Sequence, residues 1–221
     1  MMLKLYGFAA SNYYNMVKLA LLEKGLAFET VPFHGCQNPA ILAVSPRGKV
    51  PALETEYGFL SETDAILDYL EETQGGPALL PSDPFARAQV RAMAKEIELY
   101  IELPARLCYA EVIFGGRPTP EGLKRKAHRD LIKGFATLSR RAKFAPYVMG
   151  EYFTVADLYF LYSMDLAAQV AQKLFDLDIW SAMPEAKALL ELLEQNPNVQ
   201  KVAAERAEDI PLFLERIKNA V

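Results

Sequence analysis

The spacing of apolar residues near the N-terminus restricts the possible folds more than any other feature of the sequence. Leu3–Phe8 is a short apolar run typical of a buried strand, and Leu26–Val31 is a second one. Between them, Val17–Leu21 has helical spacing, while Ser11 can cap the start of this helix and Gly25 can end it. A strand, a helix and a strand in this order predict a βαβ unit with two parallel strands.

The following segments complete an α/β domain. Asn38–Pro39 predicts the start of a short helix, and Val50–Leu53 predicts a third strand. A turn precedes a brief fourth strand at Phe59–Leu60, and Ser61–Thr63 caps a further helix. We therefore expect a βαβαββα domain over residues 1–77.

The remainder of the sequence favours helices. Gly75–Pro77 and Pro81–Pro84 are clusters of helix- and strand-breaking residues, which predict a linker. Residues 85–221 are then expected to form an all-helical domain, so that the fold class is α/β plus all-α. Pro104 should bend the first long helix. Later helices should be divided at Thr119-Pro120, Thr154, Pro184, Asn196-Pro197 and Pro211.

Composition excludes several classes of protein. The 221 residues carry a net charge of −4, which gives no basic face for nucleic acid. No uncharged apolar stretch approaches the ~18 residues of a membrane span, and no signal peptide is expected, so we expect a cytoplasmic protein. Two distant cysteines, Cys36 and Cys108, do not make a disulfide framework. Ala9–Asn12 holds no Cys-x-x-Cys pair, which argues against thioredoxin-type redox chemistry.

Four local motifs resemble those of the cytosolic glutathione transferases, in particular the bacterial serine-type members. They are Ser11 followed by Val17, the Val50-Pro51 pair, Ser61–Ile66 and Gly150–Asp157. The resemblance covers essentially the whole chain. It implies a thioredoxin-like domain that binds glutathione as co-substrate and a helical domain that shapes a pocket for a small hydrophobic electrophile. It also implies a homodimer that detoxifies such compounds, without a metal.

Ser11 matches the serine that stabilises the thiolate of bound glutathione in this family. A thiolate is the reactive form, and lowering a thiol pKa of about 8.5 by about 2 units takes about 2.7 kcal/mol. A hydroxyl that donates a hydrogen bond beside a helix N-terminus can supply much of this stabilisation. A plain helix N-cap has the same appearance, so that interpretation stays open. Asn12 and Tyr13 are close enough to tune the thiol or to contact the second substrate.

The resemblance also assigns residues to the backbone and the glycyl end of glutathione. Pro51 matches a cis-proline, and the backbone of Val50 would pair with the cysteinyl backbone of glutathione. Lys49 matches a residue near the glycyl carboxylate, and His34 is a second candidate for that carboxylate. An exposed lysine is otherwise simply solvated.

Two motifs lie at helix starts. Glu62 would meet the ammonium of the γ-glutamyl end, while Thr63 and the free N–H groups of its helical turn would hold the carboxylate. Acidic residues in a first turn also occur for reasons of the helix dipole alone. Thr154 and Asp157 form a capping box, which resembles the family signature of the helical domain and has a structural role.

The remaining candidates concern the second substrate and competing functions. Tyr100, Leu103 and Leu107 are candidates for the electrophile pocket, although apolar residues at helical spacing are commonly core. Tyr6 is near the position of the tyrosine in tyrosine-type members, but we expect it to pack in the core. The alternatives to transfer are a glutathione-dependent isomerase or reductase, and a non-catalytic ligand-binding protein of the same fold.

Overall fold

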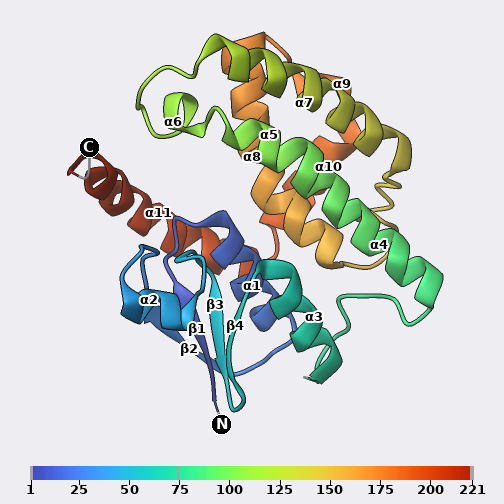
Figure 1. Ribbon diagram of the computed structural model, residues 1–221. Coiled ribbons are helices and arrows are strands. Elements are labelled where there is room, and N and C mark those ends of the chain that lie inside the picture. The colour runs from blue at the N-terminus through green and yellow to red at the C-terminus, as the bar shows by residue number, and fades with distance from the viewer. Residues whose placement is uncertain (1, 74, 220–221) are drawn as a thin grey trace. The chain divides into compact units, whose positions relative to one another are not determined.

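A four-stranded mixed sheet, with strand order β2-β1-β3-β4, organises the N-terminal part of the computed structural model, which describes residues 2–73 and 75–219 (Figure 1). β1 (Leu3–Gly7) and β2 (Phe28–Pro32) are parallel. β3 (Ala52–Thr55) runs antiparallel to β1 and to β4 (Gly58–Ser61). The parallel pair confirms the predicted βαβ unit.

Two helices provide the apolar residues that cover the sheet. α1 (Asn12–Glu23) and α3 (Thr63–Thr73) pack against each other, and α2 (Pro39–Val44) is a short connecting helix, as predicted. The core combines side chains from the strands and both helices: Leu3, Leu5, Tyr14, Val17, Leu21, Leu53, Ile66 and Leu70. Burial of these apolar side chains is the main favourable term for this layer.

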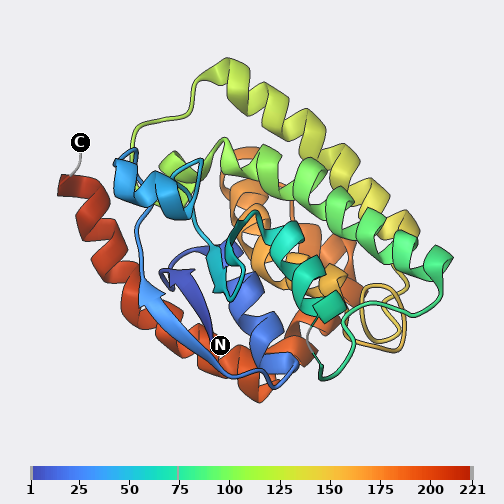
Figure 2. The same ribbon diagram turned by 60° about the horizontal axis from the view of Figure 1, so that its bottom comes forward.

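The chain divides into two compact units. One contains the chain up to Leu79 together with the segment from Asn196 onward, and the other runs from Leu80 to Gln195. The last helix, α11 (Pro197–Asn219), therefore belongs by its contacts to the unit that holds the sheet, where it packs on α1 (Figure 2). The expected domain limits, 1–77 and 85–221, stay a prediction of the sequence.

The second unit is built of helices around one buried helix, α8 (Val155–Phe175). Its other helices are α4 (Pro84–Ile97), the π-helical turn η1 (Glu98–Glu102), α5 (Leu103–Arg106), α6 (Tyr109–Val112), α7 (Glu121–Arg141), α9 (Ile179–Ala182) and α10 (Pro184–Glu194). Tyr159 and Phe160 of α8 are almost fully buried. The sheet-containing unit and this helical unit confirm the expected fold class.

Helix ends follow the sequence closely. The predicted capping box is present, with Thr154 and Asp157 each bonded to the other's backbone at the start of α8. A π-helical turn, η1, directly precedes the segment with Pro104, and the bend expected at this proline stays a prediction. α11 continues through Pro211, which does not divide it as expected. Contacts of α11 on both sides of this exposed proline, described below, hold the helix together.

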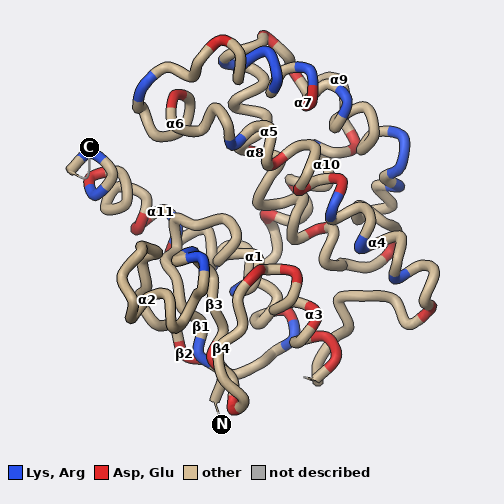
Figure 3. The backbone as a smooth tube through the Cα atoms, viewed as in Figure 1, with Lys and Arg blue, Asp and Glu red and all other residues tan. Residues whose placement is uncertain are grey.

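Charged residues of both signs are interspersed along both units (Figure 3). Among the described helices, none combines the length and apolar character required to cross a bilayer. Cys36 and Cys108 are both free, the first exposed and the second buried.

Candidate functional site

The strand register brings the predicted glutathione contacts to one end of the sheet. Gly7 at the end of β1 pairs with Pro32 at the end of β2, and Tyr6 pairs with Ala52 at the beginning of β3. Ala52 also pairs with Ser61 at the end of β4. The segments that carry Ser11, His34, Val50 and Glu62-Thr63 all continue from this end, where α/β folds commonly bind ligands.

Ser11 occupies the N-cap of α1, and its geometry is compatible with both roles considered for it. Its Oγ accepts a hydrogen bond from the Tyr14 N–H at 3.4 Å, and its own N–H donates to the Phe8 carbonyl at 3.1 Å. Capping uses a lone pair of the hydroxyl oxygen, so the hydroxyl hydrogen remains a donor for a second group. Asn12 and Tyr13 form the first turn of the helix directly after it.

Gly7 allows α1 to approach the sheet at this point. A Cβ on Gly7 would clash with the ring of Tyr14. Glycine therefore lets the first turn of α1 pack directly on the end of β1. This fixes the start of the helix, with its positive dipole end, beside the sheet end.

The loop that carries Lys49, Val50 and Pro51 lies beside the loop that follows β2. The Val50–Pro51 peptide is cis, as the family resemblance implied. The β3 ladder begins at Ala52, so the Val50 backbone lies outside it. Gly48 has a positive φ of 61° and approaches the Cys36 carbonyl too closely for any side chain. Exposed Lys49 directly follows this glycine, and its N–H donates to Ser45 Oγ at 3.1 Å.

The start of α3 shows backbone strain. Glu62 has a φ of 69°, a region that non-glycine residues rarely adopt and that concentrates at functional sites. Its carbonyl accepts the Ile66 N–H at 3.0 Å, so Glu62 directly precedes the helical turn. Its side chain is exposed, whereas Thr63 is buried. The strained backbone thus presents a carboxylate to solvent at the N-terminus of an 11-residue helix.

His34 lies on the loop after β2, against α11. Its ring stacks on Phe8 with 4.7 Å between centroids, and its Nε2 contacts the Arg216 guanidinium. Burial and the neighbouring Arg216 lower the pKa of His34, and Asp209 opposes this shift. This favours a neutral imidazole, which would bind a carboxylate less strongly than an imidazolium. The assignment of His34 to the glycyl carboxylate stays a prediction.

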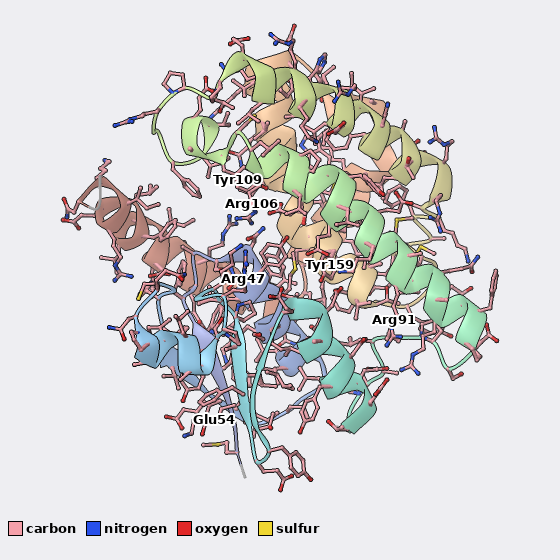
Figure 4. The ribbon with its side chains drawn as sticks, in the orientation of Figure 1. Arg47, Glu54, Arg91, Arg106, Tyr109 and Tyr159 are labelled. Atoms are coloured by element: carbon pink, nitrogen blue, oxygen red, sulfur yellow. The ribbon has the colours of Figure 1, made fainter. Side chains whose placement is uncertain are left out.

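The Tyr6 hydroxyl is bonded away from the end of the sheet that carries Ser11. Its hydroxyl donates to Glu54 Oε2 at 2.5 Å, and its ring packs edge-to-face against Phe33 and Phe59. The hydrogen bond to Glu54 is the main reason that the pKa of Tyr6 rises to about 12. Figure 4 shows Glu54 toward the end of the sheet opposite to Arg47, whose loop leads into β3. Tyr6 is therefore a packing residue, but it is only partly buried and lies outside the core, where we expected it, because its hydroxyl is bonded to Glu54 and its ring packs beside exposed Phe59.

The residues proposed for the electrophile are solvent-accessible in the helical unit. Tyr100, Leu103 and Leu107 are 50%, 41% and 37% exposed, so they are not core side chains of that unit. In the same segment the carboxylate of fully buried Glu102 accepts hydrogen bonds from Arg106 Nε at 2.9 Å and the Tyr109 hydroxyl at 2.6 Å (Figure 4). This buried network gives the exposed apolar side chains a rigid support.

No group of three or more His, Cys, Asp or Glu side chains within the described part of the chain is arranged to hold a metal ion.

Comparison with known proteins identifies the family. Residues 5–78 match the family model described as the glutathione S-transferase N-terminal domain. The whole chain is 59% identical over 218 residues to a glutathione S-transferase of Pseudomonas putida, covering 99% of each chain. This chain belongs to the glutathione S-transferase family.

Two further similarities add detail to that assignment. A crystal structure of a glutathione S-transferase from Pseudomonas fluorescens Pf-5 matches 90% of this chain and 97% of its own, with a TM-score of 0.73 and 27% identity. A maleylacetoacetate isomerase of Pseudomonas aeruginosa is 40% identical over 99 residues, which cover 42% of this chain and 47% of the isomerase. The expected enzyme class, a glutathione S-transferase, is confirmed at the level of the family.

Sequence reasoning missed the contribution of α11 to this end of the sheet. Asp209, Phe213 and Arg216 contact the turn before α1 and the loop after β2. Asn15 was also missed, although it is fully buried and its amide donates to the Ala9 carbonyl at 2.8 Å. In the sequence, the available signal for Asn15 was an asparagine directly before the apolar part of the predicted helix.

Proposed function

We propose that this enzyme binds glutathione at the common end of its sheet, stabilises the thiolate with Ser11 and transfers it to a small apolar electrophile. The observation that supports the proposal most strongly is the register of the four strands in the sheet. It brings together the N-cap hydroxyl of Ser11, the Val50 backbone and the strained Glu62-Thr63 start of α3. The family assignment supplies the class of co-substrate.

Two helix N-termini at this end suit the charges of glutathione. The N-terminus of α1 follows Ser11, and the N-terminus of α3 follows Glu62. Each carries roughly half a positive charge, which favours an anion. The thiolate would lie at the first and the γ-glutamyl carboxylate at the second, with Thr63 adding a hydroxyl donor. Exposed Glu62 would receive the γ-glutamyl ammonium.

Lys49, Val50 and Pro51 would hold the remainder of the tripeptide. The backbone of Val50 lies outside the β3 ladder and would pair with the cysteinyl residue in an extended, strand-like manner. Exposed Lys49 would meet the glycyl carboxylate, and His34 lies on the adjoining loop. These contacts fix the sulfur near position 11 and so convert a weak thiol into an oriented nucleophile.

Ser11 would act as a hydrogen-bond donor to the sulfur. Its oxygen caps α1 through the Tyr14 N–H, so its hydrogen would be free to donate to the sulfur. A hydrogen bond to a charged group contributes about 1.5–3 kcal/mol. This corresponds to a thiol pKa about 1–2 units lower than without the donor.

Titration of the bound thiol tests this role. The Ser11→Ala variant should raise the pKa of bound glutathione, followed by thiolate absorbance near 240 nm, by about 1–2 units. Ser11→Gly should do the same with less loss of helix stability, because glycine is a better N-cap than alanine. Ser11→Thr retains the hydroxyl and should stay close to the wild type. A titration curve that does not move in the alanine and glycine variants excludes Ser11 as the activator.

A glutathione-dependent isomerase is the second candidate function, because relatives of this chain include a maleylacetoacetate isomerase. In isomerisation the thiolate adds to the substrate and leaves again, so glutathione is regenerated. In transfer one glutathione is consumed for each product. Quantifying free thiol against product, with halogenated aromatic and unsaturated dicarboxylic substrates, separates the two functions. A protein that binds no glutathione at millimolar concentration in calorimetry would instead be a non-catalytic member.

Three finer properties complete the proposal. Tyr100, Leu103 and Leu107 would bind the electrophile through apolar contacts. Leu107→Gln should then raise KM for an apolar electrophile and leave glutathione affinity unchanged. We also propose a cytoplasmic homodimer with a detoxifying role, on the basis of the family assignment. Light scattering of the purified protein should give twice the chain mass.

A further inference from the structure

One face of α11 contacts α1, the turn between β1 and α1, and the loop after β2. Glu205 pairs with buried Lys18 of α1, and Asp209, one helical turn later, accepts a hydrogen bond from the Ala10 N–H. Phe213 then stacks on Phe8, and Arg216 contacts His34. These four α11 residues are separated by four, four and three positions, which places them on one stripe of the helix.

The polar groups of the turn between β1 and α1 are fixed by specific partners. The Ser11 N–H donates to the Phe8 carbonyl, and the Asn15 amide donates to the Ala9 carbonyl at 2.8 Å. Ala10 is the residue immediately before Ser11, and its N–H donates to Asp209 Oδ2 at 2.7 Å. Asn15 belongs to the adjoining helix, whereas Asp209 is 199 positions away in the sequence.

The hydrogen bond from Ala10 to Asp209 is well placed to fix the turn. Its acceptor is a carboxylate, and hydrogen bonds to charged acceptors are shorter and stronger than neutral ones. The stacked rings of Phe8 and Phe213, with centroids 5.2 Å apart, add a second contact between the same turn and the same stripe of α11. The helix continues through Pro211 because Asp209 before it and Phe213 after it both contact the turn.

We propose that Asp209 is a positioning residue for the reaction, which holds the Ser11 hydroxyl at the glutathione sulfur through the Ala10 backbone. The inference rests on the proposed function of Ser11. Displacement of a reacting group by about 1 Å can lower a rate by about a hundredfold. The C-terminal helix thus contributes to thiol activation without contacting the thiol.

A second physical effect acts in the opposite direction and can be separated from positioning. The Asp209 carboxylate is an anion close to the site, and a like charge disfavours a thiolate. Burial raises the pKa of Tyr14, and Glu205 and Asp209 add to this shift; at His34, whose pKa is lowered by burial and Arg216, Asp209 opposes the shift. If charge dominated, removing it would lower the pKa of the bound thiol. If positioning dominates, removing the acceptor raises that pKa.

Substitutions at Asp209 distinguish the two effects. Asp209→Asn removes the charge but retains an oxygen acceptor, so we expect wild-type kinetics within about twofold. Asp209→Ala removes the acceptor. It should raise the thiol pKa by about 1 unit and lower kcat at neutral pH about tenfold, with a smaller change in KM for glutathione. The assays are thiolate absorbance and turnover of 1-chloro-2,4-dinitrobenzene.

A double variant ties Asp209 to Ser11. If both residues act through the same hydroxyl, adding Asp209→Ala to Ser11→Ala should change kcat less than twofold. Glu205→Gln is the matched control, because it alters a contact one turn earlier on the same stripe. It should lower stability and leave the thiol titration unchanged. Should Asp209→Ala not fold, Asp209→Glu retains the charge but displaces the acceptor, and it should raise the thiol pKa as well.

The outcomes separate this inference from the proposed function. If Ser11→Ala does not shift the thiol titration, the proposed function fails, whatever Asp209 does. If Ser11→Ala shifts it but Asp209→Ala and Asp209→Glu do not, positioning by α11 is refuted while the role of Ser11 stands. A lower thiol pKa in both the alanine and the asparagine variants would show that Asp209 acts only through its charge.

Discussion

Asp157 of the helical unit allows a quantitative test of how burial changes the contribution of a set of hydrogen bonds to the free energy of unfolding. Its carboxylate accepts the Val148 N–H at 2.8 Å, the Thr154 N–H at 2.8 Å and the Thr154 hydroxyl at 3.0 Å. The residue is fully buried, with 0% of its surface exposed. Replacing it with alanine would leave two buried backbone N–H groups without an acceptor.

Asp178 has an equivalent set of bonds in water and serves as the matched control. It accepts the Trp180 N–H at 3.1 Å, the Ser181 N–H at 3.0 Å and the Ser181 hydroxyl at 2.6 Å. These bonds are exposed, so water can replace the carboxylate in an alanine variant. Number and type of donors are the same in both cases, and burial differs.

The difference in burial sets the expected stability cost of each alanine variant. Each buried N–H left unpaired costs about 1–3 kcal/mol. Asp157→Ala should therefore lower the free energy of unfolding by about 3 kcal/mol or more at pH 7. Asp178→Ala removes an exposed N-cap whose donors water can satisfy, and it should cost clearly less than Asp157→Ala.

The two carboxylates should also respond to pH with opposite sign. Burial raises the pKa of Asp157 to about 6, although its hydrogen bonds oppose this, whereas the bonds to Ser181 lower the pKa of Asp178. A raised pKa means that the folded state holds a proton that the unfolded state releases. The pH-dependent part of the Asp157 contribution is therefore fully present below about pH 4 and is lost as pH rises through about 6, so the cost at pH 7 is that of the unpaired N–H donors alone. The contribution of Asp178 is present above about pH 4 and is lost as pH falls.

Urea unfolding from pH 7 down to about pH 3 measures both effects, because the lower limit lies below the ordinary pKa of an aspartate. Trp180 is the single tryptophan and lies in the helical unit, so its fluorescence reports unfolding there, with circular dichroism as a second probe. The cost of Asp157→Ala should grow as pH falls from 6 to 4, and the cost of Asp178→Ala should stay constant over that range and shrink only below about pH 4. Equal costs at pH 7, or pH slopes of the same sign, would refute the argument from burial.

Two further predictions concern the sheet-containing unit. Tyr6→Phe should leave the thiol titration of bound glutathione unchanged. Because the pKa of Tyr6 rises from 10.0 to about 12, the stability advantage of the wild type should be full below pH 10 and disappear as pH rises through 12. Glu205→Ala leaves the ammonium of Lys18 buried, 6% exposed, and should cost about 3 kcal/mol in urea unfolding. Lys18→Met leaves a partly solvated carboxylate and should cost less.

Local periodicity and capping residues were sufficient to predict most elements of this fold. The apolar runs around Leu5 and Phe28 gave the parallel strand pair, because a helical stretch lies between them. Thr154 and Asp157 gave the start of α8, because a capping box is read from residues three positions apart. These features depend on interactions between near neighbours, which the sequence shows directly.

The common location of the site residues follows from topology once the strand order is known. β1 and β4 end, and β3 begins, at the same end of the sheet, so the segments that carry Ser11, Val50 and Glu62 lie there without any pairwise signal in the sequence. The positive φ of Glu62 was not predictable, because glutamate gives no local indication of it. Nor was the bond from Tyr6 to Glu54, which joins residues 48 positions apart.

The role of α11 marks the limit of sequence reasoning for this chain. Glu205, Asp209 and Arg216 are charged residues on an amphipathic helix, a pattern that by itself indicates a solvated face. In the structure the same stripe meets a buried lysine, a backbone N–H and a histidine. Periodicity defines the stripe but not its partners, which lie near the opposite end of the chain. Thiol activation can therefore depend on a residue that no motif around Ser11 contains.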